Sequence, residues 1–157
     1  MTSTPSSLVL TSYDFVRSEQ RSDFRRDRLE SVASFLQAHL GPYGDPIEQI
    51  RAALVRAAGD GPHDGGTVTL AESDEEIVGA VVTNATHMAG YTPENLLVYI
   101  ATHSGHRGQG IGRALLERTI EACSGSIALH VEPENPAVYL YRSLGFTQKY
   151  LEMRYHR

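Results

Sequence analysis

Residues 96–113, LLVYIATHSGHRGQGIGR, join an apolar run to a glycine-rich turn and the start of a helix. The apolar run at 96–102 predicts a strand buried on both faces, as in the centre of a sheet. The glycines of the turn let the backbone adopt positive φ and approach a ligand closely. Free N–H groups at the start of the next helix, expected over 111–123, form an anion site. The stretch therefore predicts a phosphate or pyrophosphate cradle, the alternative being a turn that packs tightly without a ligand.

Two common phosphate-binding patterns do not fit this turn. The dinucleotide fingerprint needs a glycine at position 113, which is Arg113. A Walker A loop needs Gly-Lys followed by Ser or Thr, a sequence that occurs nowhere in the chain. Arg107 and Arg113 place positive charge at the two ends of the turn. The local pattern thus indicates an anionic ligand without identifying it.

Helix and strand patterns fill the rest of the chain. Apolar residues at helical spacing predict helices over 29–40 and 46–58, with Asp45 as the N-cap of the second and Pro46 at its first position. Further strands are expected near 8–13 and over 67–72, 77–86, 126–131 and 146–155, with a short helix from 135 to 145. With no internal repeat or linker, the chain is expected to be one domain over 1–157. Its fold class is α/β (α+β), a central mixed sheet covered by helices.

Composition excludes several classes of protein. The chain has 157 residues, 41% of them hydrophobic, and a net charge of −5, which argues against a broad nucleic-acid-binding surface. A single cysteine, Cys123, excludes an internal disulfide and any multi-cysteine zinc site. His103 and His106 lack suitably spaced acids or cysteines, so no metal is expected. We also expect no signal peptide, no membrane segment and a cytoplasmic location.

Two segments resemble a known family. Arg107-x-x-Gly110-x-Gly112 is similar to the acetyl-CoA signature of the GNAT N-acetyltransferase superfamily, and Ala137-x-x-Leu140-Tyr141-x-x-x-Gly145-Phe146 is similar to the motif on its following helix and strand. The resemblance covers about residues 94–147. It implies a mostly antiparallel sheet of about six strands flanked by about four helices. It also implies that the strands at 96–102 and 126–131 splay apart and admit the cofactor arm.

The resemblance also implies a set of residues that bind acetyl-CoA as co-substrate. Backbone groups of residues 100–102 would pair with the pantetheine, amides of residues 109–113 would hold the pyrophosphate, and Asn135 and Tyr141 would lie near the thioester. Asn135 stands one residue closer to Ala137 than the family pattern has it, and Ser104 replaces a common proline. The expected cofactor-binding residues are Ile100, Ala101, Thr102, Arg107, Gly108, Gln109, Gly110, Ile111, Gly112, Arg113, Asn135 and Tyr141.

Acyl transfer to an amine needs the neutral amine and support for the departing thiolate. Similarity to the family makes Tyr141 the expected acid near the sulfur, the alternative being a tyrosine that packs its ring. Alternation along 126–131 places His130 and Glu132 on one face, and histidine suits a base near neutral pH. A hydrogen-bonded sheet histidine is the alternative for His130. Glu94 and Tyr99 are further candidates for the base.

The function expected from these features is transfer of an acetyl group from acetyl-CoA to a primary amine of a small molecule by direct attack. Acetylation of a protein or aminoacyl-tRNA amine, or a non-catalytic acyl-CoA-binding module, are the alternatives. The twelve residues after Gly145 predict a single closing strand. The acceptor site is therefore expected to be lined by the 41–46 loop and the 84–93 loop, and a partner chain can add to it in a homodimer. No nucleic-acid or membrane partner is expected.

Overall fold

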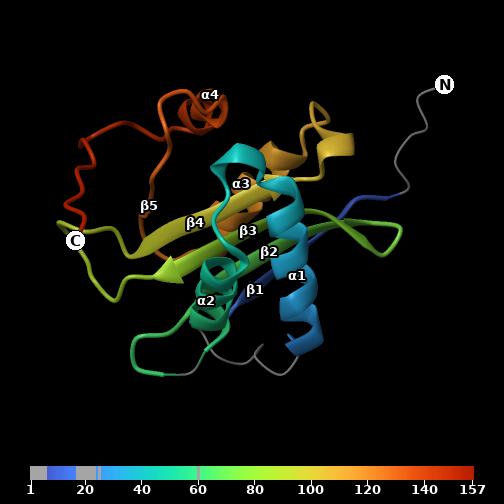
Figure 1. The fold of residues 1–157 in the computed structure, drawn as a ribbon, viewed down its shortest axis with the longest axis horizontal. Coiled ribbons are helices and arrows are strands. Elements are labelled where there is room, and N and C mark those ends of the chain that lie inside the picture. The colour runs from blue at the N-terminus through green and yellow to red at the C-terminus, as the bar shows by residue number, and fades with distance from the viewer. Residues whose placement is uncertain (1–6, 17–23, 25, 60) are drawn as a thin grey trace.

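The computed structural model describes residues 7–16, 24, 26–59 and 61–157 of the chain. It has a five-stranded sheet in the order β1-β2-β3-β4-β5, in which only the β4–β5 pair is parallel within the described residues. This confirms the mixed, mostly antiparallel α/β fold (Figure 1). The elements are β1 Val9–Asp14, α1 Arg26–His39, η2 Gly41–Tyr43, α2 Ile47–Ala58, β2 Gly66–Ser73, β3 Glu76–Ala85, β4 Asn95–Thr102, η3 Ser104–His106, α3 Ile111–Ala122, β5 Ile127–Leu129 and α4 Ala137–Ser143.

Helices cover both faces of this sheet. One core cluster packs α1 and α2 against inward residues of β2, β3 and β4, and a second packs α3 and α4 against the opposite face. In Figure 1, α1 and α2 lie in front of the sheet and α3 behind it. Because both faces are covered, burial is nearly continuous along β2 and β3 instead of alternating, and the polar Thr67 and Thr69 of β2 are buried with their apolar neighbours. Because α3 packs on one face of the sheet, the glycine turn that joins β4 to α3 lies at the end of the sheet where β4 ends.

The strands β4 and β5 part after a short contact. They pair over three positions, from Asn95 with Ile127 to Leu97 with Leu129. At the same point β4 bulges, since Val82 and Thr83 pair with Tyr99 and Leu97 and leave Val98 without a direct partner in β3. A bulge bends its strand and is frequent beside active sites. The expected splay is confirmed, and β5 turns away from β4 toward α4 in Figure 1.

Three sequence-based expectations are corrected. Asp45 is not the N-cap of α2, because Pro46 occupies that position and Asp45 is used elsewhere. The strand expected over 126–131 spans only Ile127–Leu129. The segment 146–155 is not a strand, so the sheet has five strands instead of about six. Its residues 147–155 lie exposed, and alternation alone cannot form a strand that finds no pairing edge. Among the described residues, no helix is long and apolar enough to cross a membrane.

Candidate active site

The glycine turn between β4 and α3 has the backbone conformation that its sequence predicts. Gly108 and Gly110 adopt φ of +78° and +80°, in the left-handed region that favours glycine, and Gly110 caps α3. A Cβ at either position would meet nothing within 4 Å, so the space in front of both is open. Gly112 instead lies close to Leu140 of α4, 3.3 Å from an ideal Cβ. The turn is therefore open where a ligand would approach and tight where α4 packs.

The first amides of α3 are free to bind an anion. The backbone bonding of this helix start begins with the Ala114 amide, which donates to the Gly110 carbonyl at 3.1 Å. In the described part of the chain, no acceptor pairs with the amides of residues 111–113. Unpaired N–H groups at the positive end of a helix suit a diphosphate. The cradle thus fits the anionic part of coenzyme A.

Both arginines of the turn also hold it in place. The guanidinium of Arg107 donates to the His39 carbonyl at the end of α1 at 3.2 Å. Arg113 donates to the Ser143 hydroxyl of α4 at 2.7 Å and pairs with Glu117 at 3.4 Å. The arginines therefore tie the turn to helices on opposite faces of the sheet.

The end of β4 presents an open edge beside the turn. Ile100, Ala101 and Thr102 pair with Val81, Ala80 and Gly79 of β3 on one side. On the other side β5 has already parted, so no strand of the described residues pairs with this stretch. Backbone groups of the outer edge can therefore bond to an extended ligand, as in strand addition.

Tyr141 of α4 packs in the core cluster on the α3 side of the sheet. Its side chain is buried among Leu97, Ile111 and neighbouring apolar residues, and its ring centre is 5.8 Å from that of Phe146. Burial raises the pKa of Tyr141 to about 12, so the hydroxyl keeps its proton at neutral pH. No hydrogen-bond partner for the hydroxyl lies among the described residues. The ring of Tyr141 thus packs in the core, as the alternative interpretation of this residue expected. Its O–H group, without a partner in the described part of the chain, can still donate a hydrogen bond, so the acid role stays a prediction.

The other predicted residues lie on the connection from β5 to α4. His130 and Glu132 are exposed, whereas the intervening Val131 packs against the α3–α4 cluster. The Asn135 carboxamide oxygen accepts from the Ala137 amide at 3.0 Å, so this side chain helps to start α4. The expected alternation is present, but it continues past the strand. The roles of His130, Glu132 and Asn135 stay predictions.

The sequence patterns did not predict one polar pair, which lies near the point where β4 and β5 part. The Tyr99 hydroxyl donates to the Asp45 carboxylate at 2.6 Å, across 54 positions of sequence. Burial, and next the hydrogen bond to Asp45, raise the pKa of Tyr99, so it stays a donor. The available signal was a tyrosine inside an apolar strand, because a buried phenol needs a hydrogen-bond partner. Its partner could not be chosen without the tertiary structure.

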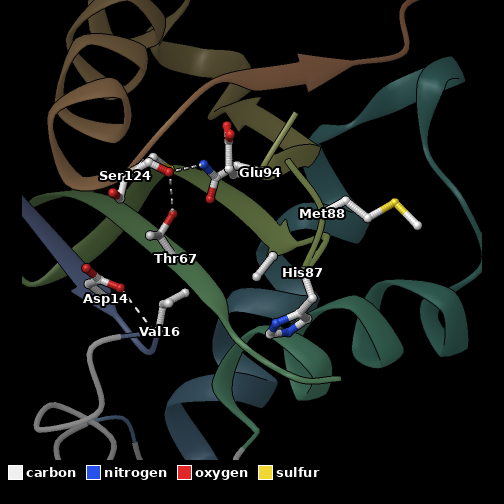
Figure 2. A pocket seen from close by; sticks show the side chains of 10 residues that line it. Asp14, Val16, Thr67, His87, Met88, Glu94 and Ser124 are labelled. Carbon is white, nitrogen blue, oxygen red and sulfur yellow. Dashed lines mark hydrogen bonds between the residues drawn. The ribbon is translucent and has the colours of Figure 1, made fainter. Parts of the chain in front are cut away.

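Residues of the 84–93 loop line a pocket at the other end of α3 (Figure 2). This pocket lies between the ends of the central strands, beside Cys123, roughly 18 Å along α3 from the glycine turn at 1.5 Å per residue. The Glu94 carboxylate there accepts from the Ser126 amide at 2.6 Å, and this bond lowers the pKa of Glu94. Glu94 thus ties β4 to β5 where they meet.

Comparisons with known structures agree with this fold. The structure is similar to an aminoglycoside N-acetyltransferase AAC(6')-Iy in complex with CoA, at TM-score 0.68 and 17% identity, covering 100% of this chain and 99% of that one. It is also similar to the ribosomal-protein-S18-alanine N-acetyltransferase from Escherichia coli, at TM-score 0.65 and 18% identity, covering 92% and 80%. No curated protein sequence matches.

A family match extends over more than half of the sequence. The family described as "Acetyltransferase (GNAT) domain" matches residues 64–148, which include the sheet from β2 to β5, the glycine turn and α4. The match confirms the resemblance carried by the two motifs. With the parted strands and the open amide cradle, it shows that the chain belongs to the GNAT family of acetyltransferases.

Proposed function

We propose that the protein transfers the acetyl group of acetyl-CoA, the acyl donor of the family, to a primary amine of a small molecule by direct attack. One observation carries the proposal: the free amides of the turn follow directly on the open edge of β4, and Tyr141 is buried in the same cluster as Leu97 of β4 and Ile111 of α3. In this arrangement residues 109–113 bind the diphosphate and residues 100–102 the pantetheine arm. Gly108 and Arg107 complete the turn.

Tyr141 has a defined part in the chemistry. The amine nitrogen forms a bond to the acetyl carbon, the carbon–sulfur bond breaks, and the thiolate leaves with the electron pair. A phenol with a pKa of about 12 is a weaker acid than a thiol of ordinary pKa, about 8.5. Tyr141 therefore stabilises the thiolate by a hydrogen bond, with the proton staying on the phenol at equilibrium.

The amine must lose a proton to react. We assign this step to His130 or Glu132, which are exposed on the segment that follows β5. Their exposure lets a water molecule carry the proton from the amine. Cys123 takes no part, because it is at the far end of α3 and burial raises the pKa of its thiol.

The test combines a binding and a turnover measurement. We expect the chain to bind CoA in calorimetry and to release thiol from acetyl-CoA with at least one small amine from a panel of amino acids, polyamines and aminoglycosides. The structural similarity to an aminoglycoside acetyltransferase supports that panel. Turnover only with peptides, as the ribosomal-protein neighbour suggests, or CoA binding without any turnover would overturn the small-molecule assignment.

A further inference from the structure

The Asp45 carboxylate and the Tyr99 hydroxyl form a polar pair beside the parting of the strands. Tyr99 is 6% exposed and belongs to β4, directly after the bulged Val98. Asp45 is an exposed residue of the loop between η2 and α2, so its carboxylate is accessible to a ligand while one oxygen is held by Tyr99 at 2.6 Å. The pair is thus a fixed negative charge at the surface of the site.

This charge lies on the face of the sheet opposite Tyr141. Tyr99 packs in the cluster under α1 and α2, whereas Tyr141 packs in the cluster of α3 and α4. The open edge of β4 runs between these two faces. A thioester bound along that edge would have Tyr141 on the side of its leaving group and Asp45 on the opposite side, from which an acceptor must approach.

The loop presents Asp45 rigidly. Pro42 and Pro46 restrict the backbone on both sides of it, and the Gly44 amide donates to the Gly41 carbonyl at 3.3 Å. The Pro46 carbonyl accepts from the Gln49 and Ile50 amides at 2.9 and 3.2 Å, which fixes the loop to α2. A preorganised carboxylate loses less freedom when it binds a cation.

A cationic side chain already lies near this carboxylate. Glu152 and, more weakly, Asp45 raise the pKa of Arg154, which belongs to the exposed segment after Gly145. Arg154 is bonded to Glu152, not to Asp45, so the carboxylate remains open to another cation. Among the described residues, Asp45 therefore has the Tyr99 hydroxyl as a hydrogen-bond partner and no ion-pair partner.

We propose that Asp45, held by Tyr99, binds a second cationic group of the acceptor, one that stays charged while another amine of the same molecule is acetylated. This inference rests on the proposed function and narrows its substrate class to di- and polyamines. A carboxylate matches an ammonium by a charge-assisted hydrogen bond. Tyr99 is a positioning residue, because it acts through Asp45.

The experiment compares linear diamines, from 1,3-diaminopropane to 1,6-diaminohexane, with n-alkylamines of matched length as acceptors. We expect kcat/KM to favour the best diamine by about tenfold, the worth of one hydrogen bond to a charged group. Asp45→Asn should remove this preference through KM, leaving the kcat/KM of the alkylamines and the CoA affinity unchanged. The carboxamide introduced by this substitution would keep an oxygen that accepts from Tyr99, so folding is preserved.

Two further variants test whether the preference for diamines depends on Asp45 in particular and on its hydrogen bond to Tyr99. Glu48→Gln removes an exposed carboxylate three residues away and should leave the preference intact. Tyr99→Phe frees Asp45 and should weaken the preference with CoA affinity unchanged. Equal use of diamines and alkylamines by the unaltered protein, or a preference that survives Asp45→Asn, would overturn this inference while the small-amine function stands. Failure with every small amine would overturn the proposed function itself.

Discussion

Two halves of the site differ in how firmly they are held. The half built from β4, the glycine turn and α3 rests on a strand paired with β3 along its length and on fully buried Leu115 and Leu116. In the other half, all of which is described, Tyr141 is the one buried residue between positions 124 and 157. The first half is a scaffold. The second is an arm attached through three strand pairs, through Tyr141 and partly buried apolar neighbours, and through hydrogen bonds from Arg113 to Ser143 and from the Ser126 amide to Glu94.

The difference in burial between the scaffold and the arm indicates where the acyl donor can bind, which is the open outer edge of β4. Pairing β5 along all of β4 would close the open edge, because each backbone group of the outer edge would then have a strand partner. A short β5 and a lightly buried arm keep that edge available while the bulge at Val98 re-aims the strand. The site therefore requires an arm that pairs with β4 over a short stretch, and low burial of the arm follows from this.

The largest expected effect is in the scaffold. Leu115→Ala should lower the free energy of unfolding by about 3 kcal/mol, because it opens a cavity where α3 packs on Gly79 of β3. Chemical denaturation measures this change. Ile120→Ala on the same helix is the control, since its side chain is 41% exposed and should change stability far less. Equal losses for the two variants would contradict the scaffold's description.

The next effect concerns the residue that joins arm to scaffold. Tyr141→Phe should lower kcat by about 100-fold, typical of a lost acid or hydrogen-bond donor, with stability nearly unchanged at neutral pH. Steady-state kinetics and denaturation at pH 7 measure the two quantities. Tyr139→Phe, on the same helix but 76% exposed, should change neither. An undiminished kcat in Tyr141→Phe would leave only the packing role.

The same variant has a signature at alkaline pH. The pKa of Tyr141 is raised from about 10 in the unfolded chain to about 12, so its contribution to stability is complete below pH 10 and is lost as the pH rises to 12. Stability measured across this window should fall less steeply in Tyr141→Phe than in the unaltered protein. Identical slopes would mean that the phenol is not buried in solution.

A smaller effect is expected at the glycine turn. Gly110→Ala should cost about 1 kcal/mol of stability through its positive φ and reduce CoA affinity about tenfold by turning a bound amide away. Gly90→Ala is a matched control: its φ is +79° and its surroundings are equally open, but it lies in the loop before β4. CoA titration should separate the two, and an equal loss of CoA affinity in both would place the diphosphate elsewhere.

The smallest effect is expected at the end of the arm. Leu151→Ala should change stability by less than about 0.5 kcal/mol, because Leu151 is 81% exposed. Denaturation at several protein concentrations measures it. A large loss that depends on concentration would show that this segment pairs with a second copy, the homodimer that the sequence allowed for.

The accuracy of the sequence-based predictions follows the same division. The central strands, α3 and the positive φ of Gly108 and Gly110 were predicted, because burial on two faces and the conformational freedom of glycine leave local patterns. The strand at 146–155 was wrong, although Leu151, Met153 and Tyr155 alternate with polar residues. A strand needs a partner edge, and local pattern does not say whether one is within reach.

What the amino-acid sequence alone determined is thus the cradle: an apolar strand, a turn of glycines and a helix whose first amides have no carbonyl to bond. Short-range sterics and hydrogen bonding suffice for these features. Only the tertiary structure decided that β5 parts from β4 after three pairs, that Tyr141 is buried in the cluster with Leu97 and Ile111, and that Asp45 meets Tyr99. These features join residues far apart in the chain, and their contacts depend on how the helices pack on the two faces of the sheet.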